Sequence, residues 1–175
     1  MAVLHINTED IRSCIDKIHA RDEVYLSGVI YTARDAAHKK LCAMLEKGEK
    51  LPFELDGATI YFAGPTPERP GRIIGSCGPT TSSRMDAFSP ILLEAGLVGM
   101  IGKGGRSKEV ADAIVRHRGV YFCAIGGAGA LAAKCVTSLE VIAFPELGCE
   151  SVKRLTVKDF PVYCAIDCHG GTMFA

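Results

Sequence analysis

Apolar residues fall into two patterns along the chain. Short β-branched or aromatic runs are typical of buried strands, and apolar residues three and four positions apart are typical of helices. The two patterns alternate in the second half, which indicates βαβ units and at least a partly parallel sheet. Strands are expected over 24–32, 58–63, 72–77, 97–101, 120–125 and 140–144 with a strand-rich tail to Ile166, and helices over 36–47, 87–95, 107–117 and 128–136 after a short first helix with Ile11, Ile15 and Ile18 inward.

The fold class expected from this order is α/β. Strand-heavy ends favour a mixed sheet or two sheet layers with flanking helices over a purely doubly wound fold. No repeat, low-complexity segment or linker divides the 175 residues, so residues 1–175 are expected to form a single domain. The run 64–71 holds three prolines and two glycines, which predicts a loop.

Composition excludes several classes of protein. Lys and Arg together number 20, as do Asp and Glu, so the formal net charge is zero and the long-range field of a nonspecific nucleic-acid binder is missing. Trp is absent, which disfavours a base-stacking platform. No apolar run is long enough for a signal peptide or a membrane span, so we expect a cytoplasmic protein with reduced cysteines.

The eight cysteines include no Cys-x-x-Cys pair, and most lie among apolar residues where cysteine acts as a small hydrophobe. Cys164 and Cys168 with His169 are conceivable metal ligands, although zinc sites usually show tighter, doubled spacing. The chain by itself is therefore expected to hold no metal or cluster.

The run from Gly78 to Asp86 is the most informative stretch, because it combines a fixed turn, several hydroxyls and one guanidinium. It follows a predicted strand and precedes a predicted helix, and backbone N–H groups at such a turn favour anions. Arg84 adds a planar fork that suits a carboxylate or a phosphate. A polar turn with a surface arginine is the simpler alternative.

Two further turns carry cations. Lys103 lies in Gly102-Lys103-Gly104-Gly105, where glycines let the backbone approach a ligand and Ser107 can cap the next helix; a flexible turn with a solvated lysine explains it equally well. Arg34 opens a helix directly after a strand, beside a structural or supporting His38. The turn 126–130 lacks the dinucleotide-binding order and is better explained by close helix packing.

Arg34, Arg84 and Lys103 would each lie just beyond the carboxyl end of a strand, the edge at which open α/β sheets bind ligands. Three cations, with hydroxyls that include those of Thr80 and Thr81, suit a small dianion such as a dicarboxylate, and a phosphate ester would fit nearly as well. A strong base or electrophile is missing from the set. The residues predict half of an active site.

Taken together these motifs resemble one family. From about Val24 to Phe174 the chain is similar to the β subunit of the iron–sulfur (class I) fumarate hydratases and the related tartrate dehydratases. The run from Gly78 to Asp86 is the most specific part of the match. The motifs that carry it are Tyr31-Thr32-Ala33-Arg34-Asp35-Ala36-Ala37-His38, Phe62-Ala63-Gly64-Pro65, Gly78-Pro79-Thr80-Thr81-Ser82-Ser83-Arg84-Met85-Asp86, Gly102-Lys103-Gly104-Gly105 and Glu146-Leu147-Gly148.

The resemblance implies a swivelling β/β/α domain and a partner α subunit whose three cysteines hold a [4Fe-4S] cluster. The open iron of that cluster would act as a Lewis acid on the substrate. Arg34, Arg84 and Lys103 would clamp the substrate carboxylates. Thr80 matches a hydroxyl proposed to take the proton from C3, although a threonine is a weak base without an activating neighbour.

The chain departs from the family pattern at Ser83 and over 151–154, which leaves the substrate open among fumarate, tartrate and methylated fumarates such as mesaconate. Asp86 and the proline-rich loop lean toward fumarate. We expect a hydro-lyase that works with its α subunit, as a dimer of αβ pairs. The rival hypothesis is a stand-alone, non-catalytic domain that binds a dicarboxylate or a phosphate.

Overall fold

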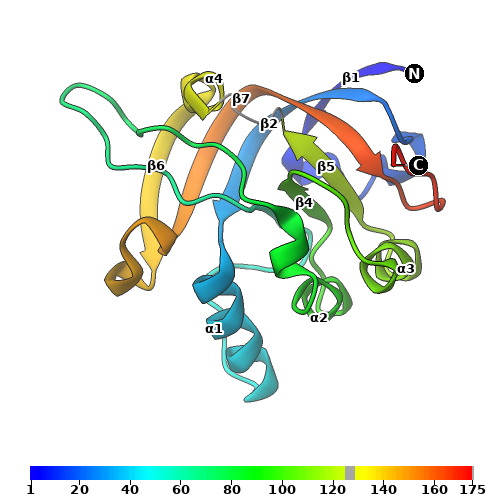
Figure 1. Cartoon of the computed structure of the whole chain (residues 1–175), viewed down its shortest axis with the longest axis horizontal. Coiled ribbons are helices and arrows are strands. Elements are labelled where there is room, and N and C mark those ends of the chain that lie inside the picture. The colour runs from blue at the N-terminus through cyan, green and yellow to red at the C-terminus, as the bar shows by residue number, and fades with distance from the viewer. Residues whose placement is uncertain (125–128, 175) are drawn as a thin grey trace.

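Two long antiparallel strands form the centre of the molecule (Figure 1). The computed structural model describes residues 1–124 and 129–174. Strand β2 (Glu23–Thr32) pairs with β7 (Val152–Ile166) from the register pair Thr32–Lys153 to the pair Glu23–Tyr163. The register shifts once between Leu26 and Gly28, a bulge at which Gly28 has φ +118°.

Each long strand carries two shorter partners on its outer side. Strand β1 (Val3–Asn7) runs parallel to the first half of β2, and β3 (Thr59–Tyr61) runs parallel to its end. Strands β6 (Val136–Ala143) and β5 (Val120–Ala124) pair antiparallel with the two halves of β7. Strand β4 (Gly99–Gly102) joins β3 to β5 in parallel, so β2, β3, β4, β5 and β7 close into a small barrel.

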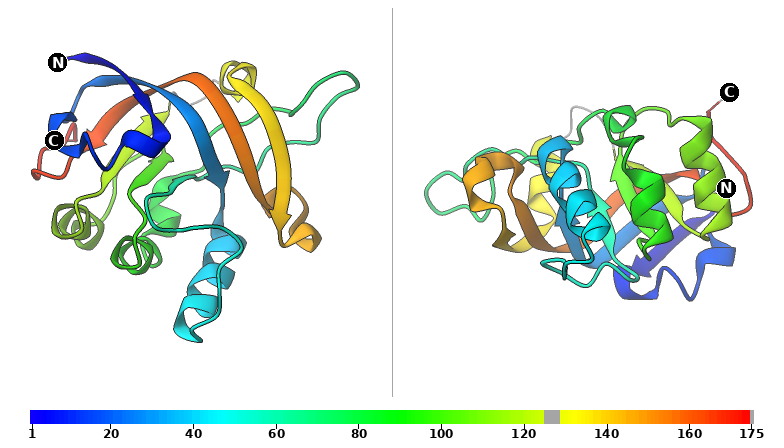
Figure 2. Two further views of the ribbon diagram at one scale, coloured as in Figure 1. Left: turned by 180° about the vertical axis from the view of Figure 1, so that it is seen from behind. Right: turned by 90° about the horizontal axis from the view of Figure 1, so that it is seen from below.

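Three helices cover one side of this barrel, as Figure 2 shows from two further directions. They are α1 (Asp35–Glu46), α2 (Ser89–Glu94) and α3 (Lys108–Arg116), while α4 (Gly129–Lys134) lies against the far side of the sheet. Gly48, with φ +69°, follows the end of α1. The Ser107 side chain accepts a hydrogen bond from the Val110 amide, which confirms the expected cap of α3.

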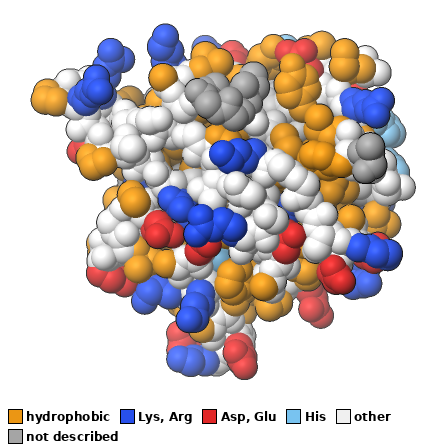
Figure 3. Space-filling model, in the orientation of Figure 1, with side chains coloured by type: hydrophobic (Ala, Val, Ile, Leu, Met, Phe, Trp, Pro, Cys, Tyr) orange, Lys and Arg blue, Asp and Glu red, His pale blue; other side chains and the backbone are white. Residues whose placement is uncertain are grey.

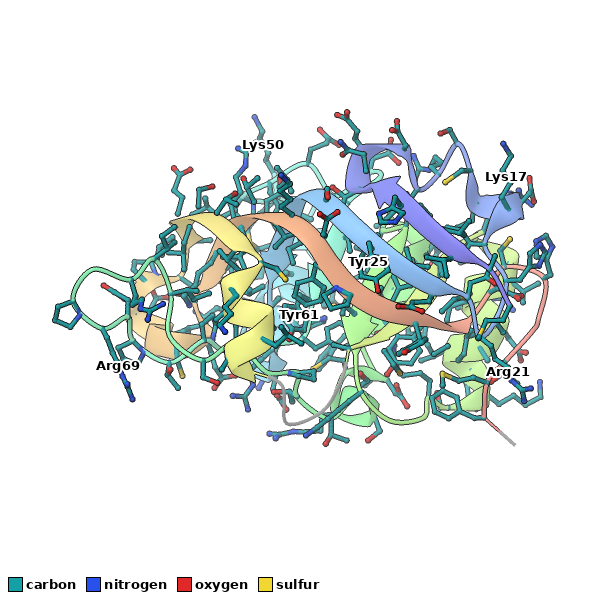
Figure 4. The ribbon with its side chains drawn as sticks, turned by 90° about the horizontal axis from the view of Figure 1, so that it is seen from above. Lys17, Arg21, Tyr25, Lys50, Tyr61 and Arg69 are labelled. Atoms are coloured by element: carbon teal, nitrogen blue, oxygen red, sulfur yellow. The ribbon has the colours of Figure 1, made fainter. Side chains whose placement is uncertain are left out.

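Alternating side chains divide the interior into two apolar clusters. On β5, Val120 and Phe122 face the interior of the curved sheet, and Tyr121 between them faces the helices. Tyr61 belongs to the first cluster, and its hydroxyl donates to the Cys77 carbonyl oxygen at 2.6 Å (Figure 4). Burial raises the pKa of Tyr61, so this phenol stays protonated and donates.

The expected α/β class with a mixed sheet is confirmed, as are most helices and strands, with ends shifted by one to four residues. The strand expected over 72–77 is wrong. Its amides bond elsewhere: that of Ser76 donates to Thr66 Oγ1 and that of Cys77 to the Gly129 carbonyl oxygen. With those donors occupied, the segment has no ladder partner and stays irregular.

The N-terminal region also differs from expectation. Ile11, Ile15 and Ile18 are buried as predicted, but the backbone forms two short 3₁₀ turns, Thr8–Asp10 and Ile15–Lys17, in place of one helix. So short a segment gains little from helix nucleation, and the buried isoleucines are enough to fix it. Strand β1 was not expected, because its side chains are mostly exposed. Among the described residues, none of the helices has the length and apolar character needed to span a membrane.

His38 on α1 is fully buried beneath Phe62 and Phe88. Its Nδ1 lies 2.9 Å from the Arg34 carbonyl oxygen, which can only accept, so Nδ1 carries the proton. Nε2 is buried and has no partner among the described residues. Burial lowers the pKa of His38 to about 4, so the ring is neutral in the folded protein.

This burial predicts a pH-dependent stability. Because the pKa of His38 is about 4 in the folded chain and about 6.5 in the unfolded chain, protons bind the unfolded state first as pH falls through that window. The free energy of unfolding should therefore fall by about 2–3 kcal/mol between pH 7 and pH 4.5 on account of this residue. Urea unfolding at both pH values should show a smaller loss in His38→Phe. Equal losses in the two proteins would contradict the prediction.

Candidate functional site

Two of the three predicted cations lie at the same edge of the sheet. Strands β2 and β4 both run parallel to β3, so their carboxyl ends meet at one edge. Arg34 follows β2 and precedes α1, and Lys103 follows β4 directly. This placement agrees with the position expected from the sequence.

The segment that carries Arg84 reaches the same edge by a different route from the one expected. It does not continue a strand, but lies alongside the ends of β3 and β4. The Thr80 amide donates to the Phe62 carbonyl oxygen at 2.7 Å, and Thr81 forms a parallel bridge with Lys103. Backbone contacts alone therefore bring Thr80 and Thr81 next to Lys103.

A close contact with Gly102 fixes the turn that follows. The Ser82 amide donates to the Lys103 carbonyl oxygen at 3.0 Å, and the Lys103 amide donates to Ser82 Oγ, also at 3.0 Å. The Tyr121 hydroxyl lies 2.8 Å from Ser82 Oγ and 2.7 Å from the Gly104 carbonyl oxygen. A side chain at 102 would overlap Ser82 Oγ and reach within 2.8 Å of the Phe62 ring. Glycine is therefore required at this position by packing.

An ion pair ties the Arg84 turn to the Lys103 loop. Asp86 accepts hydrogen bonds from Arg106 Nε at 2.7 Å and from the Ser107 amide at 2.9 Å. The Arg106 side chain has no exposed surface, and its guanidinium lies 5.2 Å from the Phe62 ring centre and 4.8 Å from that of Tyr121. Sequence reasoning missed Arg106. The available signal was that Arg106 follows the glycine-rich turn 102–105, while Asp86 ends the other motif and had been given no role.

Arg84 is held by the first turn of α1. Its Nε donates to Asp35 Oδ2 at 2.9 Å, and 54% of its side chain remains exposed. Nε is the only nitrogen of this guanidinium with a hydrogen-bond partner among the described residues. Asp35 thus orients Arg84 at the edge where Arg34 lies, while N–H groups stay available for an anion.

Arg34 lies against Gly64. A Cβ built at Gly64 would come within 3.0 Å of Arg34 Cδ and also within 3.0 Å of the Cys149 carbonyl oxygen. Arg34 Nε and Asp35 Oδ1 are buried without a hydrogen-bond partner among the described residues. Because both atoms are already covered by this chain, they mark a tightly packed part of the edge and do not by themselves indicate a ligand or a partner.

A fourth cation at this edge was not expected from the sequence. Lys153, at the start of β7, is 7% exposed. Its Nζ donates to the Cys149 and Ser151 carbonyl oxygens at 3.1 and 3.2 Å and to Ser151 Oγ at 2.8 Å. Burial lowers the pKa of Lys153. Only the strand register with Thr32 reveals its position, which no local sequence pattern signals.

The assembled site is open on one side. Thr81, Arg84 and Lys103 are exposed, and Thr80 is half-buried. Figure 3 shows Lys and Arg side chains gathered with a few carboxylates in the middle of the face seen in Figure 1. The two hollows described in the structure, of about 360 and 640 Å³, include none of Arg34, Thr80, Arg84 or Lys103. The arrangement can bind carboxylates at a surface, and Thr80 and Thr81 place hydroxyl side chains beside the cations.

Metal ligands do not gather at this edge in the part of the chain that the structure describes. Among the described residues, one group of three possible ligands has its ligand atoms within 4.8 Å of one another: Asp16, Cys168 and His169. This group lies beyond the other end of β7, away from the site edge. Asp16 already pairs with Arg118 at 2.6 Å. Burial raises the pKa of Cys77, near the site, to about 12, so it stays a thiol. These residues do not fit an iron–sulfur cluster.

Of the predicted glycine turn, residues 126–128 lie outside the described part. Gly129 lies inside it, and a side chain there would overlap Ser76 Oγ. The packing explanation is supported at this position.

Comparison with known proteins gives related sequences over the whole chain. A family model described as the fumarase C-terminus matches residues 1–175. Fumarate hydratase 2 of Leishmania major is 37% identical over 185 residues, and the match covers 98% of this chain and 33% of the relative. The anaerobic class I fumarate hydratase of Escherichia coli (strain K12) is 40% identical over 151 residues, which cover 85% of this chain and 28% of the relative.

A putative L(+)-tartrate dehydratase subunit beta of Methanocaldococcus jannaschii is 40% identical over 166 residues, and here the match covers 91% of this chain and 85% of the relative. The chain thus spans about a third of the length of the fumarate hydratases and most of the length of a β subunit.

The contact at Gly102 predicts a strict requirement for glycine. Gly102→Ala should lower the free energy of unfolding by about 2–3 kcal/mol, because the methyl group must displace Ser82 and Phe62. Urea unfolding followed by circular dichroism measures the change. Gly105→Ala is the matched control, because a Cβ there has no neighbour within 4 Å and the change should stay within about 0.5 kcal/mol. Equal effects of the two substitutions would show that Gly102 is not constrained by packing.

Proposed function

Because the chain belongs to the fumarase C-terminus family, we propose that it is the β subunit of a class I hydro-lyase that interconverts fumarate and malate. The supporting observation is the edge at which Arg34, Arg84 and Lys103 come together beside Thr80. A relative that corresponds to it in length is named as a subunit beta, which supports the two-subunit form.

In this proposal the chain's cations bind the two substrate carboxylates. Arg84 is already oriented by Asp35, so little conformational entropy is lost when its remaining N–H groups bind a carboxylate. Lys103 adds a point charge beside Thr81, its bridge partner, which is also exposed. The positive charge also stabilises negative charge that develops on the substrate when a proton leaves C3.

Thr80 is the proposed proton acceptor. Its backbone is fixed by the hydrogen bond to Phe62, which holds its position relative to Lys103. A hydroxyl is a weak base on its own, so activation has to come from a charged neighbour. We assign that neighbour to the α subunit, whose surface would face the exposed side chains of Thr81, Arg84 and Lys103.

The [4Fe-4S] cluster belongs, in this proposal, to the α subunit. The described residues of this chain offer no set of cysteines at the site edge that could hold it. The partner and the small dicarboxylate would then meet at an edge that this chain only half encloses. We further propose a single domain of the swivelling β/β/α type, in a dimer of αβ pairs located in the cytoplasm.

A second candidate is L-tartrate dehydratase, favoured by the β subunit relative that covers 91% of this chain. Both reactions remove water from a hydroxy-dicarboxylate, so the same cations would serve either one. Turnover of fumarate, mesaconate and L-tartrate by one αβ preparation, made without oxygen, separates these substrates. Tight binding of a dicarboxylate by the isolated chain, with no hydro-lyase activity in any complex, would favour a stand-alone binding domain.

Arg84 should be the most sensitive clamp residue. Arg84→Ala should lower kcat/KM of the αβ complex by roughly 10²–10³-fold, since a charge-assisted contact with the substrate is lost. Arg84→Lys should recover only part of the rate, because lysine lacks the planar fork. Arg116→Ala, at an exposed position on α3, is the matched control and should leave kcat/KM unchanged. Activity of Arg84→Ala equal to that of the control would contradict the proposed clamp.

Thr80 should act on kcat more than on KM. Thr80→Ala removes the proton acceptor but leaves the cations, so kcat should fall by roughly 10²–10⁴-fold with KM changed little. Thr80→Ser keeps a hydroxyl and should retain more activity than Thr80→Ala. Thr81→Ala gives the comparison at the neighbouring exposed hydroxyl, where KM should change in preference to kcat. A full rate in Thr80→Ala would assign the proton acceptor to the partner chain.

A further inference from the structure

A proline-rich arm projects from the body of the molecule between β3 and the Thr80 segment (Figure 1). Residues 66–73 are all exposed, among them Ile73 with 49% of its surface accessible. These eight consecutive exposed residues include two prolines and an isoleucine, and they extend away from the rest of the chain.

Two hydrogen bonds and one close contact hold the base of the arm together. The Thr66 amide donates to the Ser76 carbonyl oxygen at 3.0 Å, and the Ser76 amide donates to Thr66 Oγ1 at 2.8 Å. Gly75 packs so closely that a side chain there would overlap Thr66. Ile74, 7% exposed, anchors the returning segment of the arm in the core. The base is therefore fixed before a partner binds, so less entropy is lost there on binding.

A groove of about 640 Å³ lies between the arm and α4. Three cations line it, Arg69 and Arg72 from the arm and Lys134 from α4, and its lining residues include no Asp or Glu. Figure 4 shows Arg69 at the end of the arm, directed away from the body. Glu68 is on the arm but is not among the lining residues. Apolar surface from Ile73 and Val136 completes the groove.

The two ends of the arm connect it to the candidate site. Its outgoing segment begins at Gly64, which packs against the Arg34 side chain, and its returning segment leads through Cys77 to Thr80. A chain bound along the arm would therefore extend to the edge that Arg34 and Thr80 leave open. The occupant that fits this position is the chain that completes the site.

We propose that this groove is the docking site of the α subunit, and that it takes a segment of that subunit in which carboxylates stand beside apolar side chains. The inference rests on the proposed two-subunit function. Charge complementarity identifies the segment, since three cations without a counter-charge favour an acidic partner and disfavour a basic one. The arm, fixed at its base, forms one wall of the groove, and Ile73 supplies the apolar contact.

The test measures binding of the purified α subunit to the full β chain by biolayer interferometry. The double charge reversal Arg69→Glu with Arg72→Glu should weaken binding by at least roughly tenfold, and Ile73→Asp by a similar factor. Added salt should weaken binding of the wild-type chain but have much less effect on the charge-reversed variant. Arg116→Glu, an exposed charge reversal on α3, is the matched control and should bind like wild type. Circular dichroism verifies that the variants fold, as exposed positions should allow.

The possible outcomes separate this proposal from the proposed function. An active αβ complex whose affinity is the same in the arm variants and in Arg116→Glu overturns the docking site and leaves the function standing. A complex that depends on the arm but has no hydro-lyase activity supports the docking site and overturns the function. Self-association of the β chain through the arm, or no αβ complex at all, overturns the docking proposal.

Discussion

The antiparallel pairing of β2 with β7 is the constraint on which the rest of the structure depends. These two strands are joined along nearly their whole length, and every other strand except β4 pairs with one of them. Because β7 also pairs with β5, five of the strands close into a barrel, and β1 and β6 remain outside it as edge strands. The same pairing places Thr32 beside Lys153, so the start of one strand and the end of the other meet at the site edge.

The site edge is built by close backbone packing and is stabilised by buried charges. Gly102 allows Ser82 to bond the Lys103 backbone in both directions, and Tyr121 closes the contact from below. The Asp86–Arg106 pair, covered by aromatic rings, holds the two turns together. A buried pair of this kind costs desolvation, so its main contribution here is to fix geometry. The backbone positions of the exposed cations Arg84 and Lys103 are thereby fixed, although their long side chains can still move.

The charge distribution is consistent with the proposal that a second chain completes the site. Arg84 and Lys103 are exposed at the open edge, and Asp35 orients Arg84 there. Next to this edge, the arm presents cations and apolar surface to solvent. In the proposal both are surfaces that the partner covers.

The sequence by itself determined much of the local structure. Apolar periodicity located β2, β3, β4, β5, α1, α2 and α3, because spacing reports which face of an element is buried. It also singled out Arg34, Arg84 and Lys103 as candidates, since glycine-rich and hydroxyl-rich turns are visible without coordinates. It misread 72–77 as a strand, because composition does not show that the Ser76 and Cys77 amides bond Thr66 and Gly129.

Only the tertiary structure decided how these elements meet. The closure of the barrel, the position of Lys153 and the burial of Arg106 all depend on contacts between residues far apart in the chain. Thr81 and Lys103, 22 positions apart, became neighbours only when the Thr80 segment was laid along the ends of β3 and β4. Local patterns encode which residues are buried and where the chain turns, but strand register and long-range packing decide which side chains share a site.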